Sequence, residues 1–315
     1  MRKQKAVFNL VLLITLYILF LAGCSSEVKV NDSNGFTIIT LPDTQMYSSK
    51  FPYLFMEQTL WVRDNAEILN CKFVIHEGDI VDKSRDLSQW RAAQQAMSVL
   101  DNKVPYCFSI GNHDRPTDNF NNNFPLCRYE NQQGFGGSFD QTNDNTYHTF
   151  GAAGMNFLIL CLEYDPNKPQ LVDWANKVVE EHPDYRVIVA THSYLDRNRF
   201  TSEGTQLWNN VVRKHKNIFL VLCGHLSVGR RTDTGDNGNN VYSMLADYQG
   251  NSFGGDGLLR ILKFIPNQNK VEVRTYSTMR NRYFRQGDDK YSNEQANSFD
   301  LFYDMKTTLR PGINN

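Results

Sequence analysis

The chain has 315 residues, and its 33 basic and 34 acidic side chains give a formal net charge of -1 at pH 7. This near balance of charge excludes a protein that is attracted to nucleic acid or acidic lipid by its net charge. A hydrophobic fraction of 41% and a charged fraction of 21% are ordinary for a soluble globular protein and exclude a disordered chain.

Residues 1–23 have the features of a secretory signal peptide. Three basic residues among the first five precede an apolar stretch that is shorter than the roughly 20 residues of a membrane-spanning helix. The stretch ends in Leu21-Ala22-Gly23-Cys24, which resembles a bacterial lipoprotein processing site. The resemblance implies that Cys24 carries a lipid, that residues 24–35 form a polar tether, and that the protein is exported and membrane-anchored, in the periplasm or at the cell surface. The alternative is a signal-anchor helix with an incidental cysteine.

The front half of the chain alternates strand and helix patterns. Short apolar runs predict strands over residues 36–41, 72–76, 104–110, 155–162, 186–190 and 218–223. Apolar residues at three- and four-residue steps predict helices over residues 51–70, 84–100, 170–181 and 203–215. This alternation is typical of an α/β fold with parallel strands.

The pattern changes after residue 228. Only strands are predicted from there to residue 277, over residues 228–232, 241–247, 257–264 and 271–276. Alternation followed by hairpins indicates a sheet that continues into a second, mixed sheet. The polar insertion at 115–146 is long enough to be functional, and residues 281–315 form a C-terminal extension to which we assign no structure.

The remaining cysteines follow the strand pattern. Cys107, Cys161 and Cys223 lie within or at the end of strand-like runs, and Cys71 lies just before one, so all four are predicted to be buried thiols. Cys127 falls in a loop and is unassigned. The chain has no C-x-x-C pair, which argues against a structural zinc site.

Five predicted strands are followed by side chains that ligate metals. These side chains are Asp43, Asp79, the run Asn112-His113-Asp114, His192 and His225. Functional residues of α/β proteins collect at the carboxyl ends of strands, and carboxylate, amide and imidazole groups suit Zn, Fe or Mn. The sequence therefore predicts a metal site at one edge of a sheet.

The motifs at these positions resemble those of the calcineurin-like metallophosphoesterase family. Gly78-Asp79-Ile80-Val81-Asp82, Gly111-Asn112-His113-Asp114 and the lone His192 fit the family pattern, whereas Asp43-Thr44-Gln45 and Gly224-His225-Leu226-Ser227 each lack one histidine. The resemblance covers about residues 36–277. It implies a metallophosphoesterase domain over residues 36–280, with two facing mixed β-sheets flanked by helices in a four-layer α/β/β/α architecture.

The resemblance also implies two sets of ligands that share one carboxylate. The second metal would take an intact set, Asp79, Asn112, His192 and His225. The first metal would take the altered set, Asp43, Gln45, Asp79 and Ser227. Oxygen ligands favour harder ions such as Mn or Mg over softer ones. We therefore expect two divalent or trivalent ions (Mn, Fe, Zn or Mg), with the first bound more weakly or different in kind.

The function implied is hydrolysis of a phosphoester by a hydroxide that bridges the two metals. His113 would protonate the leaving oxygen or stabilise charge there, and Asp114 would orient His113. The alternative is a binding lipoprotein that keeps the fold but has lost turnover. The chain has no basic patch with interleaved aromatic residues, which argues against a nucleic-acid partner. The sequence identifies neither the phosphoester nor the oligomeric state.

Overall fold

The computed structural model describes residues 35–130, 132–289 and 292–306. The predicted signal peptide, the predicted lipidation site Cys24 and all but the last residue of the predicted tether lie outside these residues. Within the described ranges, no helix is long and apolar enough to cross a membrane.

The first of two large sheets is mixed, in the order β15-β14-β13-β1-β2-β3, with β16 also paired to β14. β1, β2 and β3 are parallel, and the remaining strands are antiparallel to their neighbours. The strands are β1 (Phe36–Leu41), β2 (Cys71–His76), β3 (Tyr106–Phe108), β13 (Leu258–Ile265), β14 (Lys270–Ser277), β15 (Arg282–Tyr283) and β16 (Ser298–Phe302).

The second sheet is also mixed, in the order β11-β12-β10-β7-β6-β5-β4. Its central strands β6, β7, β10 and β12 are parallel, and the outer strands are antiparallel. The strands are β4 (Phe135–Ser138), β5 (Thr146–Ala152), β6 (Met155–Cys161), β7 (Arg186–Ala190), β10 (Ile218–Cys223), β11 (Val228–Thr234) and β12 (Asn240–Ala246). A small separate ribbon joins β8 (Leu195–Asp196) to β9 (Arg199–Phe200).

The two sheets pack face to face, and the alternation of side chains along β6 shows how. Phe157, Ile159 and Cys161 belong to a core cluster that joins both sheets, while Leu158 and Leu160 belong to the cluster beneath the helices. Alternate side chains of β6 therefore point to opposite faces of the sheet, one toward the other sheet and the next toward the helices. Among the cysteines, Cys107, Cys161 and Cys223 are buried free thiols, as predicted, and Cys71 is half-buried.

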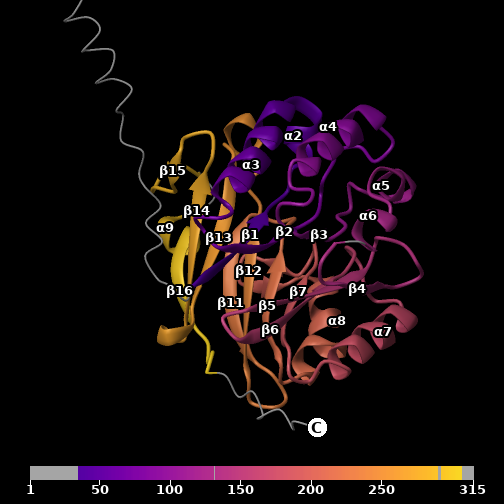
Figure 1. Ribbon diagram of the computed structural model, residues 1–315, viewed down its shortest axis with the longest axis vertical. Helices are drawn as coiled ribbons and strands as arrows, with labels where there is room; N and C mark the ends of the chain where they lie inside the picture. The colour runs from indigo at the N-terminus through magenta and orange to yellow at the C-terminus, as the bar shows by residue number, and fades with distance from the viewer. Residues whose placement is uncertain (1–34, 131, 290–291, 307–315) are drawn as a thin grey trace, which may run out of the picture. The chain divides into compact units, whose positions relative to one another are not determined.

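Helices cover the outer face of each sheet (Figure 1). α3 (Pro52–Asn65) packs on the first sheet, where Trp61 stacks on Tyr276 at a ring-centroid distance of 4.5 Å. Beside it lie α2 (Gln45–Lys50) and α4 (Leu87–Ser98). α7 (Pro169–Glu180) and α8 (Ser202–Asn210) cover the second sheet through Leu171 and Leu207. The predicted four-layer α/β/β/α architecture is confirmed.

Several elements differ from the sequence prediction. The predicted helix over 51–70 begins at Pro52, a residue suited to a first turn, and ends at Asn65, and α2 forms separately before it. The insertion is not a bare loop, because it folds into α5 (Asp118–Asn123), α6 (Cys127–Glu130) and β4. The unassigned C-terminal extension contributes β15, α9 (Glu294–Asn297) and β16 to the first sheet and its border.

Candidate metal centre

The candidate centre lies where the carboxyl ends of parallel strands from both sheets meet. β1, β2 and β3 end on one side of it, and β7, β10 and β12 end on the other. Hydrogen bonds join the two sides, since the backbone N–H of His225 donates to the Asp43 carboxylate at 3.2 Å. The structure therefore brings the predicted residues from distant parts of the sequence to one edge.

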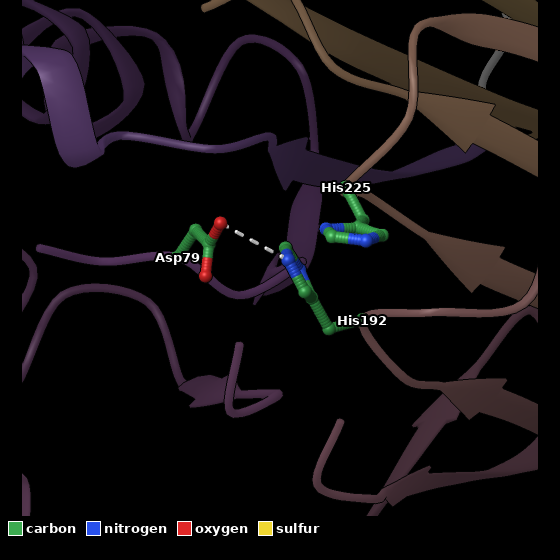
Figure 2. A group of neighbouring side chains, drawn as sticks. All are labelled: Asp79, His192 and His225. Carbon is green, nitrogen blue, oxygen red and sulfur yellow. Dashed lines mark ion pairs between the residues drawn. The ribbon is translucent and has the colours of Figure 1, made fainter. Parts of the chain in front are cut away.

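Three of the predicted ligands form a compact group. The ligand atoms of Asp79, His192 and His225 all lie within 4.8 Å of one another, and Figure 2 shows the three side chains converging from different strand ends. The His192 Nε2 atom is 3.2 Å from Asp79 Oδ2, and both side chains are buried. A carboxylate and two imidazoles at this spacing suit a transition metal.

The ring of His192 is held in one orientation. Its Nδ1 atom lies 2.8 Å from the backbone carbonyl of Glu77, which can only accept a hydrogen bond, so Nδ1 carries the proton and Nε2 faces Asp79. Burial disfavours the charged forms of both His192 and Asp79, but the attraction between the two side chains outweighs this effect. The pKa of His192 is therefore raised and that of Asp79 is lowered. Such a carbonyl partner is the usual support of a metal-ligating imidazole.

Unpartnered polar atoms test whether the residues fit a metal. Asn112 Oδ1, Gln45 Oε1 and Ser227 Oγ are all buried and make no hydrogen bond. A buried polar atom without a partner is costly, and three of them at one centre is unusual. All three belong to the predicted ligand set, so the donor set fits bound cations.

We call the group Asp79, Asn112, His192 and His225 the histidine half of the centre, and the group Asp43, Gln45, Asp79 and Ser227 the oxygen half. In the oxygen half, the Gln45 amide donates to Asp79 Oδ2 at 3.2 Å and also to Gln249. Gln249 in turn donates to Asp43 at 3.4 Å and to Asp247 at 3.1 Å. Burial, followed by the charges of Asp247 and Asp79, raises the pKa of Asp43 well above its usual range.

Three motif glycines leave room for the ligands. A Cβ atom on Gly111 would lie 2.1 Å from Asp79 Oδ1, one on Gly224 would lie 2.3 Å from Asp43 Oδ1, and one on Gly78 would lie 2.5 Å from His192 Nδ1. Gly78 also has a φ of +99°, a conformation that other residues rarely adopt. The motif glycines are therefore required by the packing of the ligand atoms.

His113 sits at the rim, beside the histidine half. Its backbone N–H donates to Asp79 Oδ1 at 2.9 Å, and its ring Nδ1 lies 2.8 Å from the carbonyl oxygen of Asp82. The carbonyl fixes the proton on Nδ1, which leaves Nε2 as the reactive nitrogen. The His113 side chain is 40% exposed, so this nitrogen is accessible to a substrate.

The prediction that Asp114 orients His113 needs correction. The buried Asp114 carboxylate accepts hydrogen bonds from the backbone N–H groups of Ile80, Val81 and Gly111 at 2.9–3.1 Å. It therefore ties the two central motif loops together, and the contact that orients His113 comes from Asp82. Burial, with the nearby Asp79 charge, raises the pKa of Asp114 to about 7.

Comparison with known proteins identifies the family. Residues 37–267 match the family described as calcineurin-like phosphoesterase. The chain belongs to this family. The uncharacterized protein YvnB of Bacillus subtilis (strain 168) is 34% identical over 290 residues, which cover 87% of this chain and 22% of that protein. The chain thus spans about a fifth of the length of this relative.

A solved structure shows the same fold. Purple acid phosphatase PPD1 from yellow lupin (Lupinus luteus) seeds has a TM-score of 0.54 to this chain at 14% sequence identity. The similarity covers 87% of this chain and 55% of the plant protein. The described domain is thus a metallophosphoesterase domain, of a family that hydrolyses phosphoesters at a metal centre.

Within this metallophosphoesterase domain, His76, the last residue of β2, has a supporting role. Its Nδ1 accepts from the backbone N–H of Gly78 at 3.2 Å, and its Nε2 lies 2.9 Å from the hydroxyl of Thr44. Burial, helped by the charge of His192, lowers the pKa of His76 to about 3. A neutral imidazole thus links the loops that carry Asp43 and Asp79.

Three further residues of the metallophosphoesterase centre were missed. Asp247 directly follows β12, and Gln249 lies two residues beyond it. Tyr164 follows β6 and packs its ring 5.3 Å from that of His225. All three come after parallel strands of the second sheet. The strand-end rule that selected His192 and His225 therefore also applied to them.

Proposed function

We propose that this protein is a metal-dependent phosphoesterase that acts through two cations, one in each half of the centre. The observation that carries the proposal is the set of three buried, unpartnered polar atoms, from Gln45, Asn112 and Ser227, among the residues of the candidate centre. Two bound ions would supply an activated water and neutralise the oxygens of the phosphate.

The residues of the chain would divide the remaining tasks. Asp79 presents one oxygen to Gln45 and His192 and the other to the backbone of His113, so its carboxylate is fixed between the two halves. Asp114 keeps the Asp79 loop and the Asn112 loop in register. This rigidity keeps the reacting groups aligned, which is a large part of catalysis in phosphoryl transfer.

His113 is the candidate general acid. With Nδ1 held by the Asp82 carbonyl, a protonated ring offers its Nε2 proton to the oxygen that leaves the phosphorus. The Asp82 carboxylate lies 3.8 Å from Nδ1 of the same ring. The reaction then ends with an alcohol and a phosphate, and His113 regains its proton from water.

A cavity of about 570 Å³ beside His113 is the candidate position of the leaving group. Asn112 and His113 line it on the metal side, and Lys83, Arg85 and Arg115 line it elsewhere. Arg115 is anchored by an ion pair with Glu163. The lining carries three cationic side chains and one carboxylate, that of Asp82, and this excess of positive charge favours an anionic substrate such as a phosphoester.

Hydrolysis of two generic substrates tests the proposal. The protein, stripped with a chelator and reloaded with Mn²⁺, should hydrolyse para-nitrophenyl phosphate or its diester, bis(para-nitrophenyl) phosphate. The variant Asp79→Asn should not, and Asp236→Asn, which changes an exposed carboxylate paired with Arg213, should behave like the wild type. Failure of the metal-loaded wild type on both esters would favour the alternative of a binding lipoprotein without turnover.

We also propose, from the sequence alone, that the protein is exported and held at a membrane by a lipid on Cys24. The support is the charged start, the apolar stretch and the Leu-Ala-Gly-Cys ending. Mass spectrometry of the protein isolated from bacterial membranes should find Cys24 as the lipidated first residue. The variant Cys24→Ser should lose the lipid, whereas an intact, uncleaved N-terminus in the wild type would contradict the proposal.

A further inference from the structure

The oxygen half contains a carboxylate that the family motifs do not include. Asp247 directly follows β12, the parallel neighbour of the strand that carries His225. Its Oδ2 atom lies 3.1 Å from Gln249 Nε2, and the same nitrogen lies 3.4 Å from Asp43 Oδ2. The carboxylates of Asp43 and Asp247 therefore face a single small group that lies between them.

The Asp247 side chain is fixed in this direction. Its other oxygen, Oδ1, accepts the backbone N–H of Gln249 at 2.9 Å, which closes a local turn. The backbone N–H of Asp247 donates to the carbonyl of Ser227 at 2.7 Å. One oxygen thus shapes the loop, and the second is directed toward Asp43.

Two polar groups without partners belong to residues that hydrogen-bond Asp79 and Asp247. Gln45 is only 3% exposed, and its Oε1 atom makes no hydrogen bond, although its nitrogen bonds both Asp79 and Gln249. The hydroxyl of Ser227 is likewise buried and unpartnered. These oxygens point to a ligand that accepts electron pairs, because a cation satisfies oxygen atoms that find no donor in the protein.

The charge balance leads to the same conclusion. Asp43, Asp79 and Asp247 bring three carboxylates together, and within the described residues no lysine or arginine forms an ion pair with any of them. His192 pairs with Asp79 only. Buried negative charge without a counterion is strongly unfavourable. The amide N–H group of Gln249, between two carboxylates, now occupies a position suited to a cation.

We propose that Asp247 is a ligand of the first metal and takes the place of a missing histidine. With Asp43, Asp79 and the carbonyl oxygen of Gln45, it makes a site built of oxygen atoms, which selects a hard divalent cation such as Mn²⁺ or Mg²⁺ over Zn²⁺. Gln249 is a positioning residue that holds Asp247 toward Asp43. The inference rests on the proposed two-metal function, and it assigns a residue to the half that the motifs leave incomplete.

Metal titration of stripped protein tests the inference without relying on activity. Calorimetry and Mn²⁺ electron paramagnetic resonance should find two ions per chain in the wild type, with the spin coupling of a close pair. The isosteric variant Asp247→Asn should keep one ion at wild-type affinity and bind the other at least about tenfold more weakly, because it loses a charged ligand. Asp236→Asn, the exposed carboxylate of the Arg213 pair, should match the wild type.

The outcomes separate this inference from the proposed function. A wild type that binds no second ion overturns the two-metal proposal itself. A wild type with two ions, together with an Asp247→Asn variant that binds both equally well, overturns only the role of Asp247.

Thermal melting gives a second readout. Without metal, Asp247→Asn should melt at the same or a higher temperature than the wild type, since it removes repulsion, and added Mn²⁺ should raise its melting temperature less. An equal rise would also overturn the inference.

Discussion

The two halves of the metal centre differ in the hydrogen bonds that their ligand side chains make. In the histidine half, the carbonyl of Glu77 anchors His192 from behind, and Asn112 Oδ1 remains unpartnered. In the oxygen half, the amides of Gln45 and Gln249 donate to the carboxylates of Asp43, Asp79 and Asp247. A metal in the histidine half would displace only the contact between His192 and Asp79, whereas a metal in the oxygen half would displace three hydrogen bonds, at about 0.5–1.5 kcal/mol each. We therefore expect sequential loading, with the histidine half filled first.

Asp79→Asn should weaken metal binding in both halves alike, because both include this carboxylate. We expect the metal content to fall in both halves and phosphoesterase activity to drop by at least about 10⁴-fold, the upper end of what one catalytic group supplies. Elemental analysis after dialysis, with circular dichroism as a control for folding, measures this. A variant that keeps one tightly bound ion would show that Asp79 serves only one half.

His113→Ala should leave both halves intact and still impair turnover. The backbone N–H that holds Asp79 is retained, so the metal content should not change, while loss of the general acid should lower kcat by about 10²- to 10³-fold. A substrate with a better leaving group, such as an aryl ester with electron-withdrawing substituents, should be affected less. Equal losses on good and poor leaving groups would argue against proton donation by His113.

The double change Gln45→His and Ser227→His should make the two halves alike. Imidazoles at these positions restore the pattern of the family and favour Zn²⁺, so we expect Zn²⁺ binding in the oxygen half to strengthen about tenfold relative to Mg²⁺. Competition titrations monitored by calorimetry measure the ratio. An unchanged preference would mean that the carboxylates alone decide which metal the oxygen half binds.

A histidine outside the centre shows how a buried imidazole behaves without a metal or an anion. His148 lies between the rings of Phe73 and Phe135, and burial lowers its pKa to about 3. Its neutral form is favoured in the folded chain, so its contribution to stability is complete above the ordinary pKa of about 6.5 and is lost as the pH falls toward 3. The wild type should lose about 1 kcal/mol more than His148→Gln between about pH 7 and about pH 5.5 in denaturant titrations. Equal losses of unfolding free energy in the wild type and in His148→Gln would contradict the neutral state of His148.

The sequence predicted the parts of the site that follow from local pattern. Strand runs followed by Asp79, Asn112, His192 and His225 predicted that these residues meet at one sheet edge, because parallel strands bring their carboxyl ends together. Asp247 ends a strand that was also predicted, so its signal was present in the sequence.

Other features depend on contacts that no local pattern contains. Gln45 and Gln249 are 204 residues apart in the chain, and only the folded arrangement of β1 and β12 brings their amides together. The role of Asp114 was misjudged because adjacency to His113 does not determine where a carboxylate points in a tight loop. Likewise, β16 is a short strand in a polar extension, and only its partner β14 stabilises it.

The pairing of β16 with β14 has a consequence for how the protein behaves in concentrated solution. β16 covers residues 270–274 of β14, where Arg274 also bonds Phe299 and Asp300. Without residues 298–302, that edge would present unpaired backbone groups next to Val271 and Val273, and exposed edges of this kind recruit other chains. By pairing with β14, the C-terminal segment therefore protects this edge from pairing with other chains. A chain shortened before Ser298 should keep its metal ligands but lose solubility.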